Sequence, residues 1–341
     1  MPSKRDPKLD LAKAVLICLV VLGHYIEAAD GRWNTDLGYG MRAIYMVHMP
    51  AFVFLAGVTA KAAGTVSKVV QWLTLLVVFT AIYVGVDAIT PRVNRGFELI
   101  EPYWILWFLF ALALWQALMP LVERFPRTLV VASVAVGAAA GLIPAIGTEF
   151  TLSRATVYLP FFVVGAVYGK RFLAAIDRLP GMARAGLVLV AVACALYLGT
   201  QGIARHWLYG NRSVDDLNAG LLEGLALRLV LDAMAFVGLA ALWAVLPRRE
   251  GWFTVPGRRS LAIYLLHGIP VTLLSAWLRD VLDLPLGTPL LLAASVGLTC
   301  ITVAVFSLPF WDTAIRQVGT VISRHVPRGA QGRRKPPTAA R

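Results

Sequence analysis

Charged side chains are scarce in this sequence. Asp, Glu, Lys and Arg make up 15% of its 341 residues, whereas soluble globular domains carry about 25%. Hydrophobic residues reach 58%, and the mean hydropathy is +0.71. Because apolar runs long enough to cross a bilayer recur along the chain, the composition excludes a soluble enzyme and predicts an all-α, polytopic protein embedded in the lipid bilayer.

Cysteine is rare as well. Cys18, Cys194 and Cys300 are the three in the chain, and each lies inside an apolar run. Their spacing matches neither a disulfide framework nor a metal site, so we expect buried packing and no metal. A glycine-rich phosphate loop and a soluble-type internal repeat are also missing from the sequence.

Apolar runs of about 20 residues predict membrane spans. We expect about ten of them in one bundle, with a single transmembrane domain over residues 1–324. The expected spans are 9–28, 41–60, 69–89, 103–121, 128–146, 155–173, 184–203, 224–246, 260–278 and 289–310.

The distribution of charge predicts how these spans are oriented. The formal net charge is +13, which in a soluble protein would suggest binding to nucleic acid. If the N-terminus lies inside, however, 22 Lys and Arg residues fall on the inner side and eight on the outer side, while acidic residues gather outside. Cytoplasmic loops are enriched in Lys and Arg. We therefore expect both termini in the cytoplasm, an integral protein of a bacterial inner membrane, and no nucleic-acid partner.

Two connecting segments stand out. Residues 325–341, HVPRGAQGRRKPPTAAR, are basic and rich in proline, so we expect a disordered cytoplasmic tail that rests on anionic lipid. The longest outer connection covers about 204–223 and is polar. It is a candidate extracytoplasmic binding surface.

The first predicted span combines apolar and ionisable residues. Residues 10–24, DLAKAVLICLVVLGH, retain Asp10, Lys13 and His24, and ionisable groups inside a membrane helix are costly enough to mark a functional site. Lys13 and His24 are eleven residues apart, so both fall on one stripe of a helix, about 16 Å apart along its axis. Asp10 lies near the same stripe. The helix would present a cation and an imidazole to a molecule lying along its face.

This segment resembles the opening helix of the membrane-bound acyltransferase-3 superfamily, in which a basic residue, ten others and a histidine follow one another. The resemblance is greatest to the branch similar to fucose 4-O-acetylases, and it continues in order through residue 267. Four more segments carry it: MVHMPAFVFLAG at 46–57, YWILWFLFAL at 103–112, SRATVYLPFFVVG at 153–165 and SLAIYLLH at 260–267. Ala56 stands where this branch usually has serine.

The resemblance implies an acyltransferase that moves an acyl group, usually acetyl, from a cytoplasmic coenzyme A thioester to a hydroxyl of a sugar, glycan or other exported acceptor. Acetyl-coenzyme A or another acyl-coenzyme A would be a co-substrate. The acceptor, the choice between acetyl and succinyl, and the oligomeric state stay open.

Acyl transfer to an alcohol needs a base for the hydroxyl proton and groups that stabilise the oxyanion. His24 is the expected base, because imidazole titrates near neutrality; a covalent acyl-histidine is the alternative. His48 opens the second span from the same outer side and could share or orient a proton with His24.

The remaining candidates surround these two histidines. Lys13, Arg154, Tyr264 and His267 are expected to bind the donor or to act electrostatically, and Asp10 and Arg228 to support them. Each also has a structural alternative. Asp10 could cap a helix or pair with Lys13, and Arg228 could form a self-neutralising pair with Asp232 one turn later.

Two other classes of protein remain open at this point. A transporter or flippase for a polar or lipid-linked molecule would use buried ionisable groups along its pathway, although no internal repeat of the kind such proteins often contain is evident. A membrane scaffold without catalytic activity would leave Lys13 and His24 on one stripe unexplained.

Overall fold

The computed structural model describes residues 6–29, 37–90, 101–142, 151–217, 219–285 and 287–324. Within these ranges all regular structure is helical, and helices satisfy their backbone hydrogen bonds internally where lipid offers none. Eight helical stretches in the described chain are long and apolar enough to span a membrane. They are α1 (Pro7–Ala29), α2 (Leu37–Thr59), α3 (Thr65–Ile89), the 3-10 turn Trp104–Leu106 with α4 (Trp107–Arg124), α6 (Leu152–Val157) with α7 (Leu159–Asp177), α8 (Gly181–Thr200), α10 (Leu221–Val245) and α14 (Gly287–Phe306).

Two further segments complete the set of predicted spans. α12 (Ser260–Leu266) and α13 (Gly268–Leu282) pass the same test together but meet at an angle of 45°. α5 (Pro126–Ala139) is apolar and shorter, at 14 residues. The all-helical, polytopic membrane fold predicted from the sequence is confirmed. The cytoplasmic placement of both termini stays a prediction.

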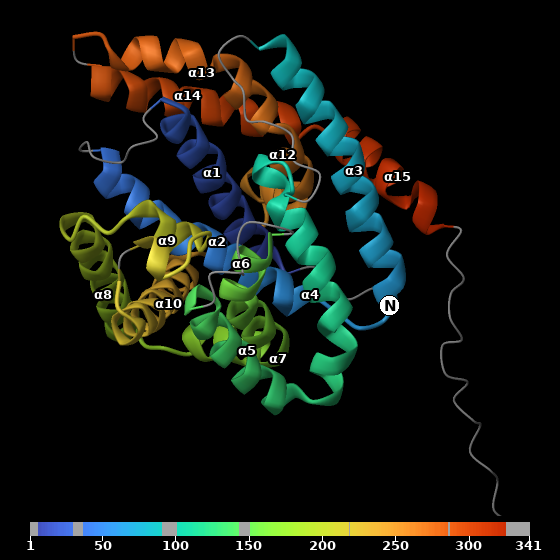
Figure 1. Cartoon of the computed structure of the whole chain (residues 1–341), viewed down its shortest axis with the longest axis vertical. Coiled ribbons are helices and arrows are strands. Elements are labelled where there is room, and N and C mark those ends of the chain that lie inside the picture. Colours follow the sequence, from blue (N-terminus) through green and yellow to red (C-terminus); the bar gives the residue numbers. More distant parts are fainter. Residues whose placement is uncertain are drawn as a thin grey trace, which may run out of the picture.

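α1 runs through the interior of the bundle, whereas α8 lies at its periphery (Figure 1). In the most apolar stretch of each helix, 61% of the residues of α1 are buried and only 6% of those of α8. α1 packs against α2, α13, α14 and the short α11 (Val255–Arg258). The helix with the unusual ionisable residues is therefore surrounded by protein rather than by lipid.

α2 and α7 pack so closely that only glycine fits at their crossing. A Cβ atom on Gly57 would lie 2.1 Å from the carbonyl oxygen of Phe162, and one on Gly165 would lie 2.3 Å from that of Phe54. Small residues let membrane helices approach in this way. The glycines that end two of the family-like segments are thus explained by packing, which fixes α2 beside α7.

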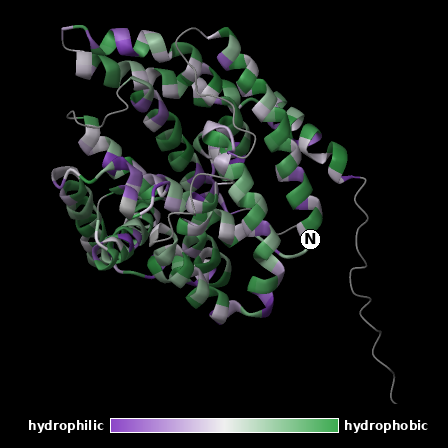
Figure 2. Cartoon of the chain, viewed as in Figure 1, coloured by the Kyte–Doolittle hydropathy of each residue, from purple (hydrophilic) through white to green (hydrophobic). Residues whose placement is uncertain are grey.

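The chain continues past α14 into α15 (Pro309–Ser323), a helix that the sequence analysis did not predict. α15 lies along α3 (Figure 1), where a Cβ atom on Gly319 would meet the side chains of Gln71 and Leu75. It carries Arg316 and Asp312, which pair with each other at 2.8 Å. Figure 2 shows apolar residues along most of the long helices and hydrophilic ones mainly toward their ends and loops. The predicted tail, 325–341, lies outside the described residues.

Candidate active site

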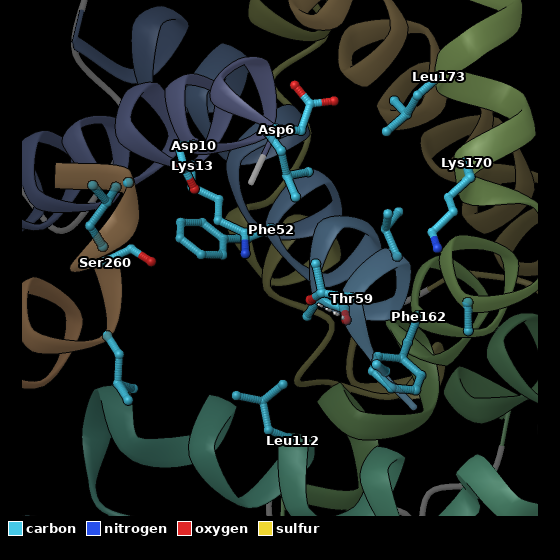
Figure 3. Close-up of a pocket in the computed structure, with 18 of the residues that line it drawn as sticks. Asp6, Asp10, Lys13, Phe52, Thr59, Leu112, Phe162, Lys170, Leu173 and Ser260 are labelled. Atoms are coloured by element: carbon cyan, nitrogen blue, oxygen red, sulfur yellow. Dashed lines mark hydrogen bonds between the residues drawn. The ribbon is translucent and has the colours of Figure 1, made fainter. Parts of the chain in front are cut away.

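A cavity of about 1200 Å³ lies between the helices, lined by α1, α2, α4, α7 and α12 among others. Figure 3 shows Lys13 and Lys170 reaching into it from opposite sides. On α1, α2 and α7, most of the lining comes from residues 9–20, 49–59 and 166–177, respectively. These are the parts of the helices that the charge distribution assigns to the cytoplasmic side.

The cavity is strongly basic. Its described lining contains eight cationic residues and three acidic ones, Asp6, Asp10 and Asp177. The cationic residues are Lys13, Lys61, Lys68, Lys170, Arg171, Arg248, Arg258 and Arg316. A cleft lined by one sign of charge with low-dielectric walls concentrates ligands of the opposite sign.

The three acidic groups are already engaged by cations. Asp177 accepts hydrogen bonds from Lys8 at 2.6 Å and from Arg248 at 2.9 Å. Asp6 lies 3.5 Å from Arg248, and the Nε of Arg258 donates to Asp10 at 3.0 Å. The positive charge of the other lining residues is therefore only weakly offset within the cavity.

The inner end of the cavity is apolar, and each of three histidines lies about one helical turn beyond it. Val20, Phe52 and Tyr264 line the cavity. His24 follows Val20 by four residues on α1, His48 precedes Phe52 by four on α2, and His267 follows Tyr264 by three at the end of α12. Residues three or four apart share a helix face. The three imidazoles thus form the next layer outward from the cavity.

His24 is in contact with His267 and Trp104. The ring centroids of His24 and His267 lie 5.3 Å apart, and those of His24 and Trp104 lie 5.5 Å apart. The backbone of Trp104 has a φ of 40°, which a bulky side chain rarely adopts and which such residues retain mostly at functional sites. Through the contact of His24 with His267, the structure brings together a histidine from the first helix and one from the ninth predicted span.

His267 stands at the break between α12 and α13. Its Nδ1 donates to the carbonyl of Tyr264 at 2.7 Å, and its Nε2 is buried without a hydrogen-bond partner among the described residues. His48 instead packs its ring against Tyr45 at 4.5 Å and donates from Nδ1 to the carbonyl of Ile44 at 2.8 Å. In the described chain, the histidine ring in contact with that of His24 is that of His267.

The other predicted site residues fall into two groups. Lys13 and Tyr264 line the cavity. Asp10 also lines it and pairs with Arg258, a partner that the sequence did not suggest. Arg154 lies outside the cavity lining, with its guanidinium 5.2 Å from the ring centroid of Trp107 and within electrostatic range of the outer end of α1.

Arg228 interacts with a carboxylate of its own helix and with a backbone carbonyl of the outer segment, residues 203–216. Its Nη2 lies 2.8 Å from the carboxylate of Asp232, and its Nη1 donates to the carbonyl of Trp207 at 2.9 Å. This arrangement is the self-neutralising pair expected as the structural alternative. Arg228 also fastens the outer segment to α10.

Sequence reasoning missed a carboxylate beside the proposed base. Glu27 follows His24 by three residues on α1, and its Oε2 lies 3.4 Å from the Nδ1 of His24. Extending the stripe from Lys13 through His24 by one more turn would have found it.

No group of three or more His, Cys, Asp or Glu side chains in the described ranges is arranged to hold a metal ion.

With this geometry in view, comparison with known proteins identifies the family. The model of a protein family described as "Acyltransferase domain" matches residues 6–307. The chain belongs to this acyltransferase family. The match includes every helix that contributes to the cavity except α15, and it contains His24, His48 and His267.

Two curated relatives are similar over part of the chain. One is "Nodulation protein NolL" of Sinorhizobium fredii, 31% identical over 192 residues, which are 49% of this chain and 50% of the relative. The other is "Nodulation protein NolL" of Mesorhizobium japonicum, 27% identical over 130 residues, which are 32% and 34% of the two chains. The chain thus spans half or less of the length of these relatives. No solved structure matches it.

Proposed function

We propose that this protein is a membrane O-acyltransferase that moves an acyl group, acetyl in the first instance, from a cytoplasmic acyl-coenzyme A to a hydroxyl of an exported sugar, glycan or similar acceptor. The observation that carries the proposal is the basic cavity that leads along α1 from Lys13 toward His24. Membership of the acyltransferase family supports the reaction class.

The cavity suits an acyl-coenzyme A in both charge and polarity. Its basic part offers Lys and Arg donors to the nucleotide phosphates, and such charge-assisted hydrogen bonds are among the strongest in proteins. Its inner part, with Ile17, Val20 and Phe108, suits the less polar pantetheine arm and the acyl group. Lys13 and His24 are about 16 Å apart along the axis of α1, so an extended arm would bring the thioester toward His24.

His24 is the proposed base for the transfer. Its imidazole takes the proton of the acceptor hydroxyl while the acceptor oxygen forms a bond to the acyl carbon. The carbon–sulfur bond then breaks, and the proton passes to the departing thiolate to give free coenzyme A. In the alternative with a covalent acyl-His24 intermediate, the ring nitrogen that acts as base would instead attack the acyl carbon. The transfer would then take place in two steps.

The acceptor would approach His24 from the side opposite the cavity. The charge distribution assigns that side to the exterior of a bacterial inner membrane, where exported glycans are found. Arg154 and Trp107 stand there, and a guanidinium at this position could stabilise the oxyanion.

Binding of acetyl-coenzyme A to the purified full-length protein tests the donor. We expect saturable binding that weakens as salt is raised, because phosphate contacts are screened. A transporter or a scaffold would not need a thioester, so failure to bind acetyl-coenzyme A contradicts the proposal. A comparison of exported glycans with and without the gene, scanned for a lost acyl mass, would then identify the acceptor.

A further inference from the structure

Glu27 lies at the centre of a small polar cluster on the outer side of His24. The hydroxyl of Tyr45 on α2 donates to its Oε2 at 2.7 Å, and the hydroxyl of Tyr209 on α9 (Arg205–Tyr209) donates to its Oε1. The Nδ1 of His24 lies 3.4 Å from Oε2 and makes no hydrogen bond among the described residues. Two phenols thus hold the carboxylate in place while its edge faces the imidazole.

Charged and titratable groups on four helices lie near Glu27. His24 lies on the same helix, Tyr45 and His48 on α2, Tyr209 and Arg205 on α9, and Arg154 on α6. The two arginines favour the ionised carboxylate, and a proton donor on Nδ1 of His24 would favour it too. The surroundings therefore suit a carboxylate that accepts hydrogen bonds.

Tyr209 reaches Glu27 because the outer segment is folded back onto the bundle. Four of its carbonyls accept hydrogen bonds from side chains of other elements: Ile203 from Arg42 at 3.0 Å, Trp207 from Arg228 at 2.9 Å, Leu208 from Tyr158 at 2.7 Å and Gly210 from Ser153 at 2.7 Å. A segment fastened in this way is part of the site rather than a loose connection.

The far end of the outer segment is closed by its own hydrogen bonds. The backbone N–H of Ser213 donates to the carboxylate of Asp216 at 3.2 Å, and the backbone N–H of Asp216 donates to the hydroxyl of Ser213 at 3.1 Å. The bond from the backbone of Ser213 lowers the pKa of the Asp216 carboxyl below its ordinary value.

We propose that Glu27 is a positioning residue for His24, and that Tyr209 of the outer segment, together with Tyr45, holds Glu27 in position. At 3.4 Å the two groups are close enough that a small rotation of the neutral imidazole lets the carboxylate accept the Nδ1 proton, which leaves the lone pair on Nε2 for the acceptor hydroxyl. When Nε2 takes the proton, the charge of Glu27 balances the imidazolium. In serine hydrolases, likewise, a carboxylate orients the histidine and balances its positive charge while the histidine takes the proton of the nucleophile. The inference rests on the proposed function, since it assigns His24 the role of base.

The tautomer of His24 tests this without relying on activity. The full-length protein, labelled with ¹⁵N at histidine and placed in lipid nanodiscs, is measured at alkaline pH, where imidazole is neutral. The His24 signals are those that disappear in His24→Gln. We expect the ring proton on Nδ1 in the wild type and a loss of this preference in Glu27→Gln, whose amide can donate as well as accept.

Two further variants separate positioning from loosening of the outer segment. Ser153→Ala removes an anchor of that segment without touching Glu27 and should retain the wild-type tautomer. Tyr209→Phe should shift the tautomer in the same direction as Glu27→Gln but to a smaller extent. It provides the test if Glu27→Gln does not fold. A wild-type tautomer in Glu27→Gln or in Tyr209→Phe, or an equal change in Ser153→Ala, would overturn the proposal.

Kinetics give a second readout and separate this inference from the proposed function. In native membranes, Glu27→Gln should lower the kcat for release of coenzyme A from acetyl-coenzyme A by roughly 100-fold or more, with the KM for acetyl-coenzyme A within about twofold of wild type. If His24→Ala is inactive and Glu27→Gln has wild-type kinetics, the inference fails and the proposed function stands. If His24→Ala has normal activity, the proposed function itself fails.

Discussion

The imidazole rings of His24 and His267 lie 5.3 Å apart, although one belongs to the first helix and the other to the break between α12 and α13. The broken span brings a residue from the start of the matched family region together with one from its later part. This contact lies one helical turn beyond the inner end of the basic cavity. On the proposed function, a thioester held in the cavity would end beside these two histidines.

Lys13 should contribute to donor affinity. We expect Lys13→Ala to raise the Kd for acetyl-coenzyme A by about tenfold or more, because a charge-assisted hydrogen bond contributes roughly 1.5–3 kcal/mol. Lys13→Arg should recover most of the affinity. Arg212→Ala, which removes an exposed cation of the outer segment, is the matched control and should bind normally. Equal binding by Lys13→Ala and wild type would remove Lys13 from the donor site.

The close crossing of α2 and α7 should tolerate no side chain. Gly165→Ala would force a methyl group against the carbonyl of Phe54, and overpacking of this kind costs about 1–3 kcal/mol. We expect a lower Tm for the purified protein. Gly186→Ala on α8 is the control, since a Cβ there meets nothing within 4 Å. A Tm for Gly165→Ala equal to that of Gly186→Ala would show that the crossing is looser than described.

The sequence analysis predicted the features that follow from the helical repeat. It missed the contacts between segments that lie far apart in the sequence. The stripe from Lys13 to His24 could be read directly, because a helix repeats every few residues along the chain. The contact of His24 with His267 could not, because it needs the bend between α12 and α13. Glu27 was within reach of the same stripe, whereas Tyr209 reaches the site only because four side chains hold the outer segment.

The number and direction of the spans depend on α5. At 14 residues, its helix is about 21 Å long, shorter than the hydrocarbon core of roughly 30 Å. If α5 crosses, Arg127 before it is cytoplasmic and Arg212 after α8 is external. In a variant without its native cysteines, Arg212→Cys should react with a membrane-impermeant thiol reagent in intact cells, and Arg127→Cys should react only after lysis. Labelling of both positions, or of neither, in intact cells would contradict this topology.

His24 is the residue on which the account depends most. The decisive measurement compares His24→Ala with the wild type, using purified full-length protein for acetyl-coenzyme A binding and native membranes for acyl transfer. A general base contributes about 10²–10⁴-fold to a rate, so the variant should lose at least about 100-fold in transfer while it inserts in the membrane and binds the donor as the wild type does. Normal transfer by His24→Ala would contradict the central claim.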